Sequence, residues 1–291
     1  MAKAIVGIIG GSGIYALEGL TDLRQERVAS PWGEPSDALG FGRIGSTEAV
    51  FLARHGKGHR FSPSTINYRA NIDAMKRVGV TDIIALSACG SFKSELAPGL
   101  FVLIDQFEDR TTRREASFFG TGCVAHVSMA HPIAPLLRKR IAEAATAEGI
   151  AVHIGGTYVC IEGPQFSSLA ESLAFKARGA GVIGMTGATE AKLAREAEIS
   201  YATIAMVTDY DCWHEDHGPV DVAGVMKVMR ANAAHAASLI ARTLRDFPAE
   251  HEPCPVGSDR ALDNAIMTHA DAMDPNLRAK LSAVAGRVLG A

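Results

Sequence analysis

Short apolar stretches alternate with amphipathic ones along most of this 291-residue chain. Runs rich in valine and isoleucine predict buried strands, and apolar residues spaced by three and four predict helices that cover them. The predicted strands are 4–9, 49–53, 80–86, 100–104, 150–161 (a pair broken by two glycines), 181–184 and 199–207, and the main predicted helices are 62–78, 132–148, 188–198 and 221–244. This alternation favours an α/β fold with a twisted, largely parallel sheet covered by helices.

The C-terminal part of the chain has a different pattern. Residues 248–255 hold three of the twelve prolines and are typical of a linker, and a helix opened by Asp274 and Pro275 follows. We therefore divide the chain into an α/β domain at 1–247 and a linker with a C-terminal helical extension at 248–291. The apolar face of that extension must pack on its own subunit or on a neighbouring one, as a lid or as a subunit contact.

Polar side chains gather where the predicted strands stop. In open α/β sheets, ligands bind in the crevice beyond the carboxyl ends of the strands. The residues at these ends are Ser12 within Gly10-Gly11-Ser12-Gly13, then Arg54 and His55, Ser87, Thr186, and finally Asp209 and Asp211. We expect them to meet in one crevice.

Each of these stretches, taken alone, also has a plainer interpretation. The glycine-rich turn lacks the spacing of a dinucleotide site or of a P-loop, so it could be only a tight turn. Arg54 and His55 could stand in a solvated basic loop, and Asp209 could stabilise a solvated turn. We interpret Cys89 as a buried, inert thiol rather than as a nucleophile.

Taken together, the strand ends point to one kind of chemistry. One arginine, one histidine and three hydroxyls in a glycine-lined crevice would hold a phosphate without any metal. Asp209 and Asp211 would repel that phosphate and need a hydrogen-bond donor instead, such as an exocyclic amine or a protonated ring nitrogen. Phosphate on one side and a donor-rich heterocycle on the other indicate a nucleoside phosphorylase.

The motifs resemble those of the purine nucleoside phosphorylase superfamily, in order, over about residues 5–245. The matching stretches are Gly7-Ile8-Ile9-Gly10-Gly11-Ser12-Gly13, Ala53-Arg54-His55-Gly56, Ala88-Cys89-Gly90-Ser91, Ile104-Asp105-Gln106-Phe107, Ile161-Glu162-Gly163-Pro164-Gln165-Phe166-Ser167, Met185-Thr186 and Ala205-Met206-Val207-Thr208-Asp209-Tyr210-Asp211-Cys212-Trp213. The resemblance implies a single α/β domain with a central twisted mixed sheet flanked by helices. It also implies a homotrimer, with a hexamer built from two trimers as the alternative.

The resemblance further implies roles for individual residues. The implied phosphate ligands are Ser12, Arg54, His55, Ser87, the backbone of Ala88, and Thr186. The implied nucleoside-binding residues are Met185 under the ribose, Phe166 on the base, and Asp209, Tyr210 and Asp211. The implied specificity residues around the 5' group are Ser167, Val222, Val225 and, from a neighbouring subunit, His126. Asp209 and His55 are the expected catalytic residues.

The implied activity is the phosphorolysis of S-methyl-5'-thioadenosine to adenine and 5-methylthioribose 1-phosphate, in purine and methionine salvage. The carboxylate of Asp209 can accept a hydrogen bond from a 6-amino group, whereas a 6-oxo group would leave two acceptors face to face. Enzymes of this superfamily that act on 6-oxopurines have Asn at this position. The alternatives are a 6-oxopurine nucleoside or methylthioinosine phosphorylase, and a nucleoside-binding protein without catalysis. Thr186-Gly187-Ala188-Thr189-Glu190 departs from the usual Val-Pro-Glu type of sequence, and this departure could relax the 5' selectivity.

Composition excludes several other classes. The net charge is −3 with both signs mixed, so neither nucleic acid nor a membrane surface is an expected partner. The start of the chain is not typical of a signal peptide, and no apolar run approaches a bilayer span, so we expect a cytoplasmic protein. Five scattered cysteines without a Cys-x-x-Cys pair indicate reduced thiols. We expect no metal and no cofactor, with inorganic phosphate as a co-substrate.

Overall fold

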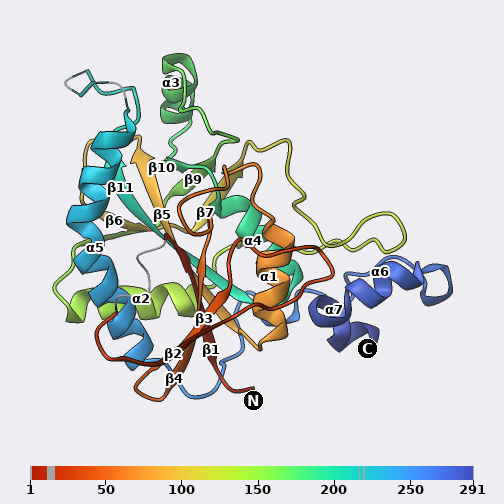
Figure 1. The fold of residues 1–291 in the computed structure, drawn as a ribbon. Coiled ribbons are helices and arrows are strands. Elements are labelled where there is room, and N and C mark those ends of the chain that lie inside the picture. Colours follow the sequence, from red (N-terminus) through yellow and green to blue (C-terminus); the bar gives the residue numbers. More distant parts are fainter. Residues whose placement is uncertain (1, 12–16, 216, 219, 291) are drawn as a thin grey trace.

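A computed structural model describes residues 2–11, 17–215, 217–218 and 220–290. Within these residues the strands form one mixed sheet with helices on both faces (Figure 1). The strands are β1 (Ile5–Gly10), β2 (Leu20–Glu26), β3 (Leu39–Ile44), β4 (Thr47–Ala53), β5 (Asp82–Ser91), β6 (Phe101–Leu103), β7 (Gln106–Asp109), β8 (Val152–Ile154), β9 (Thr157–Cys160), β10 (Val182–Gly184) and β11 (Ser200–Asp209).

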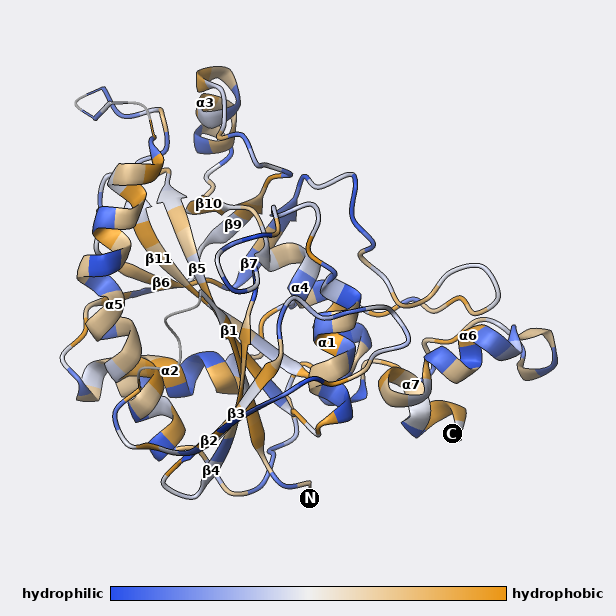
Figure 2. Ribbon diagram, in the orientation of Figure 1, coloured by the Kyte–Doolittle hydropathy of each residue, from blue (hydrophilic) through white to orange (hydrophobic). Residues whose placement is uncertain are grey.

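The helices lie in two groups. In Figure 1, α5 and α2 cover one side of the sheet, α1 and α4 cover the other, and α3 projects beyond its upper end. The helices are α1 (Tyr68–Arg77), α2 (Pro135–Ala147), α3 (Leu169–Ala177), α4 (Gly187–Glu196), α5 (Val222–Arg245), α6 (Pro275–Lys280) and α7 (Ser282–Leu289). Because both faces are covered, the central strands β1, β5 and β11 are buried along nearly their whole length. Figure 2 shows that each of them contains an apolar stretch.

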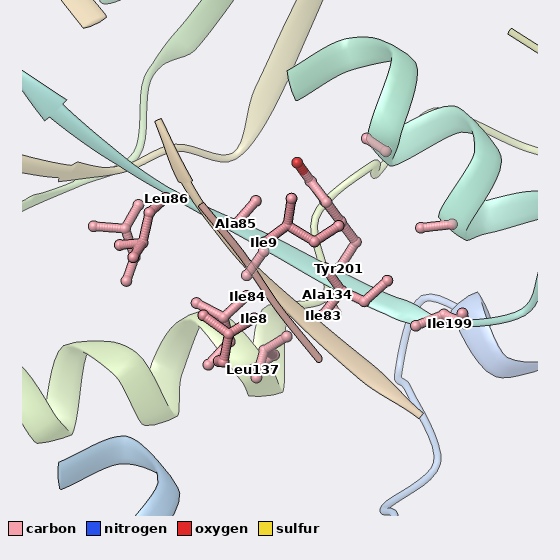
Figure 3. Close-up of a cluster of buried hydrophobic side chains, with 14 of the residues drawn as sticks. Ile8, Ile9, Ile83, Ile84, Ala85, Leu86, Ala134, Leu137, Ile199 and Tyr201 are labelled. Atoms are coloured by element: carbon pink, nitrogen blue, oxygen red, sulfur yellow. The ribbon is translucent and has the colours of Figure 1, made fainter. Parts of the chain in front are cut away.

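The core lies between the central strands and their helices. Figure 3 shows Ile8 on β1, Ile84 on β5 and Tyr201 on β11 in the same cluster as Leu137 of α2. Each of these side chains is no more than 2% exposed. Burying a side chain of this size contributes roughly 1.5–3 kcal/mol, so this cluster holds the strands in their register.

The strand order brings the predicted ligand-binding ends together. β1 lies between β4 and β5, and β11 pairs with β5, all in parallel. Gly10 is opposite Ala53, and Asp209 is opposite Gly90. Their carboxyl ends therefore meet at one edge of the sheet.

Several predicted boundaries were wrong. The helix expected from residue 62 begins at Tyr68, because the side chain of Asn67 caps it by accepting from Ala70 N. The strand expected to end at residue 86 continues to Ser91, because β11 pairs with it as far as Gly90. Ser87 therefore lies inside a strand. Strands β2, β3 and β7 were not predicted, and β2 is exposed along almost all of its length.

The C-terminal extension packs on its own chain, on the side of α1 (Figure 1). The predicted single helix is divided into α6 and α7 at Leu281, which is fully buried. Arg287 makes a bidentate pair with Glu198, at 2.7 and 2.6 Å, at the turn before β11. None of the described residues of this extension lines the cavity at the carboxyl ends of the strands.

Candidate active site

A cavity of about 340 Å³ lies at the carboxyl edge of the central strands. Residues from β5, β10 and β11, the loops after β4 and before α3, the N-cap of α4 and the N-terminal part of α5 form its walls. The residues predicted for the site that line it are Arg54, His55, Ser87, Ala88, Phe166, Ser167, Met185, Thr186, Asp209, Asp211, Val222 and Val225. Its volume is within the usual range for a small-molecule site.

Two of the predicted residues that the structure describes, Tyr210 and His126, are not part of this lining. Ser12 lies outside the described residues. Tyr210 points away, with its hydroxyl donating to Ser94 O at 3.1 Å and its ring against Trp213. His126 is exposed and lies outside the cavity of its own chain. The prediction assigned His126 to the site of a neighbouring subunit.

Arg54 follows the last residue of β4 and is held there by its backbone, because its N–H donates to Gly10 O at 2.9 Å. Its side chain is buried at one end of the cavity, where Nε and Nη2 donate to the two carboxylate oxygens of Glu190. Burial alone would lower the pKa of Arg54, but the charge and hydrogen bonds of Glu190 raise it above its ordinary value. The guanidinium is therefore always charged, and its bidentate edge is occupied by a carboxylate.

His55 stands beside Arg54 and stacks on His59, with ring centroids 4.0 Å apart. Burial, with the positive charge of Arg54, lowers the pKa of His55 to about 4, so the ring is neutral near pH 7. Its Nδ1 lies 2.8 Å from the carbonyl oxygen of Phe61, which can only accept. We therefore assign the proton to Nδ1, which leaves Nε2 as a hydrogen-bond acceptor.

Hydroxyls and a helix terminus complete this end of the cavity. Thr186 is the N-cap of α4, but its side chain makes no capping hydrogen bond. Its hydroxyl is therefore available beside the partially positive start of the helix, which favours anions. Ser87 Oγ lies 3.1 Å from the hydroxyl of Tyr158. Burial raises the pKa of the neighbouring Cys89 thiol to about 12, as expected for an inert side chain.

The opposite end of the cavity carries two carboxylates. Asp209 is the last residue of β11, and its oxygens accept from Asp211 N at 2.8 Å and from Thr208 Oγ1 at 2.7 Å. Burial, with the charge of Asp209, raises the pKa of Asp211. The buried hydroxyls of Ser167 and Ser172 lie close enough to lower that pKa, but neither makes a well-formed hydrogen bond. This end is rich in acceptors.

Between these two ends, one side of the cavity is apolar and open to solvent. Val222, Val225 and Met226 lie in the first two turns of α5, which begins where Asp221 accepts from Gly224 N at 2.9 Å. Val222 is 67% exposed and Met226 is 45% exposed. Phe166, 44% exposed, lines the same cavity from the loop before α3. A single chain therefore leaves this part of the cavity uncovered.

Sequence reasoning missed several residues of the site. Those lining the cavity are His59, Pro63, Cys89, Gly90, Ile161, Pro164, Ile183, Gly184, Thr208 and Met226. Glu190 was also missed as the partner of Arg54. Its position four residues after Thr186 in a predicted helix was the available signal, because such residues share a helix face.

The fold and this arrangement of anion-binding and acceptor groups define a class of enzyme. The sequence matches the phosphorylase superfamily over residues 5–245, and the chain belongs to that family. It is 64% identical over 289 residues, 99% of each chain, to the S-methyl-5'-thioadenosine phosphorylase of Bradyrhizobium diazoefficiens.

Solved structures agree with this assignment. A methylthioadenosine phosphorylase from an Antarctic soil metagenomic library superposes with a TM-score of 0.91 at 42% identity, covering 98% of this chain and 99% of the other. The methylthioadenosine phosphorylase of Schistosoma mansoni, solved in complex with adenine, has a TM-score of 0.84 at 38% identity, covering 91% and 99%. The predicted family and its mixed-sheet fold are thereby confirmed.

Two kinds of feature are absent from the described residues. None of their helices combines the length and apolar character needed to cross a membrane. Their His, Cys, Asp and Glu side chains include no group of three or more arranged to hold a metal ion.

Proposed function

We propose that this protein catalyses the phosphorolysis of S-methyl-5'-thioadenosine, giving adenine and 5-methylthioribose 1-phosphate. One observation carries the proposal: Arg54 and Thr186 line the same cavity as Asp209 and Asp211. An anion site and an acceptor-rich site then lie on either side of a space suited to a nucleoside. The relatives with this enzymatic name support the choice of reaction.

The reaction follows from the two ends of the cavity. A phosphate oxygen attacks C1' of the ribose, the C1'–N9 bond breaks, and its electron pair passes to the purine. A proton at N7 relieves that charge. The carboxylate of Asp209 takes this proton up from solvent and passes it on, directly or through relayed hydrogen bonds. Acid catalysis of this kind contributes about 10²–10⁴-fold. Phosphate held in line stabilises the developing sugar cation, so no covalent enzyme intermediate is needed.

The neutral His55 has a specific part in this scheme. Hydrogen phosphate carries one O–H group, and the bare Nε2 of His55 is an acceptor for it. The hydroxyls of Ser12, Ser87 and Thr186, the backbone of Ala88 and the guanidinium of Arg54 supply donors for the remaining oxygens. Inorganic phosphate is then a co-substrate, and neither a metal nor a cofactor takes part.

The base-binding end favours adenine. Asp209 is held as an acceptor because its own oxygens receive hydrogen bonds from Asp211 N and Thr208 Oγ1. A 6-amino group can donate to it, whereas a 6-oxo group cannot. Phe166 lies on the base, Met185 lies under the ribose, and Val222 and Val225 accommodate the 5'-methylthio group. This preference can be tested by comparing the turnover of S-methyl-5'-thioadenosine, adenosine, methylthioinosine and inosine. Faster turnover of inosine would overturn it.

We infer that the working unit is a homotrimer, in which His126 of one chain reaches the 5' end of the next. The exposed Val222 and Met226 support this, since they leave the cavity open in a single chain. Light scattering would distinguish a trimer from a hexamer, and a monomeric active enzyme would contradict the proposal. The five free cysteines support a cytoplasmic location.

A further inference from the structure

The bidentate edge of Arg54 is turned toward Glu190 rather than toward the cavity. Arg54 Nε donates to Glu190 Oε1 at 2.5 Å, and Nη2 donates to Oε2 at 3.0 Å. The two residues are 4% and 2% exposed. A fork of this shape suits phosphate equally well, so a phosphate in the cavity cannot use the edge that Glu190 already holds.

The remaining hydrogen bonds of Arg54 fix the plane of its guanidinium. Nη1 donates to Leu86 O at 2.7 Å, which makes three donors engaged out of the five that the group carries. One N–H on each terminal nitrogen then has no partner among the described residues. Because Arg54 lines the cavity, these are the two donors that a bound anion can use.

Glu190 is itself held in place. The hydroxyl of Tyr201 donates to Glu190 Oε2 at 2.9 Å, and Thr203 Oγ1 donates to that hydroxyl at 3.1 Å. Glu190 also lies one helical turn after Thr186, on the same side of α4. The first turn at the start of α4 therefore brings together Thr186, whose hydroxyl lines the cavity, and Glu190, which orients Arg54.

We propose that Glu190 is a positioning residue for phosphate, acting through Arg54. It directs the two free N–H groups at the anion, and its charge offsets that of Arg54, so phosphate is held by directed hydrogen bonds rather than by net charge. Glu190 touches neither reactant. The proposal rests on the proposed phosphorolytic function and adds to it the residue that sets the affinity for phosphate.

The variant Glu190→Gln tests this inference. An amide has one acceptor oxygen, so Arg54 keeps only one of its two contacts and the plane of the guanidinium is released. We expect the KM for phosphate to rise about tenfold or more, while the Kd of S-methyl-5'-thioadenosine, measured without phosphate, changes by less than about twofold. Glu196→Gln is the matched control, because it changes another buried carboxylate of α4 that contacts Ser117 and Phe118 instead.

Two results would overturn the proposal. One is a folded Glu190→Gln variant with the wild-type KM for phosphate, and the other is an equal loss of nucleoside affinity, which would indicate general distortion. If Glu190→Gln does not fold, the variant Tyr201→Phe provides the test. It removes one hydrogen bond to Glu190 and leaves the Arg54–Glu190 ion pair intact. A rise of about threefold in the KM for phosphate supports the inference, and no rise overturns it. Wild-type enzyme that releases adenine equally well without phosphate would overturn the proposed function itself.

Discussion

Gly90 lies opposite Asp209 across the β5–β11 pair, so closely that a Cβ on residue 90 would stand 2.7 Å from Asp209 Oδ1. Only glycine leaves the carboxylate where it is. We predict that Gly90→Ala displaces Asp209 and lowers kcat/KM for the nucleoside by about 10²-fold, because catalytic groups tolerate little misplacement. The KM for phosphate should change little.

Steady-state kinetics with each substrate varied in turn would check this prediction. Gly120→Ala is a suitable control, because a Cβ there meets nothing within 4 Å. Equal activity of the two variants would show that the position of Asp209 does not limit the reaction.

Arg54 should have separable structural and functional roles. Arg54→Ala leaves Glu190 buried without its partner, which costs about 3–5 kcal/mol in unfolding free energy. The double variant Arg54→Met, Glu190→Leu removes both charges, so we predict that it regains most of that stability but not the use of phosphate. Denaturant unfolding and phosphate saturation curves measure the two effects. A stable double variant with normal phosphate dependence would remove Arg54 from the anion site.

Asp209→Asn should change the choice of base without unfolding the site. The amide oxygen can still accept from Asp211 N. The amide NH₂ can donate to Thr208 Oγ1, whose own proton is then free to turn to Cys89 O, 3.2 Å away. We predict slower cleavage of adenine nucleosides and a rise of about tenfold or more in the relative rate on inosine-type nucleosides. Competition between the two nucleosides in one reaction gives the ratio directly. An unchanged ratio would mean that the base is recognised elsewhere.

The raised pKa of Glu196 predicts that the unfolding free energy of the protein depends on pH. Burial raises its pKa to about 7 from 4.5, although hydrogen bonds from Phe118 N and Ser117 oppose this. The folded state therefore binds the proton more tightly than the unfolded state. The resulting stability is fully present below about pH 4.5 and is lost as the pH rises to 7.

Glu196→Gln removes this titration. As the pH rises from 4.5 to 8, the unfolding free energy of the variant should increase by on the order of 3 kcal/mol relative to that of wild type. Urea unfolding at several pH values would test this. If the unfolding free energies of the two proteins changed with pH in the same way, the prediction would be contradicted.

Much of the site could be predicted because strand ends are local features of a sequence. Arg54, Ser87, Thr186 and Asp209 each lie at or near the end of an apolar run. The parallel pairing of β1, β4, β5 and β11 brings Arg54, Ser87 and Asp209 together, and the antiparallel pairing of β10 with β5 adds Thr186. The Arg54–Glu190 pair could not be predicted in this way, because it joins residues 136 positions apart. Its geometry depends on how α4 packs against the sheet.

Two other differences have equally specific causes. The strand containing Ser87 continued past its predicted end because pairing with β11, rather than its own composition, sets its length. Tyr210 was expected to touch the substrate, but its hydroxyl donates to Ser94 O and its ring packs against Trp213, which holds the side chain away from the cavity.

The most direct test of the account is the release of adenine from S-methyl-5'-thioadenosine by the purified protein, with and without inorganic phosphate. We predict release that requires phosphate and yields 5-methylthioribose 1-phosphate in equal amount. Release that is independent of phosphate, or that yields free methylthioribose, would contradict it.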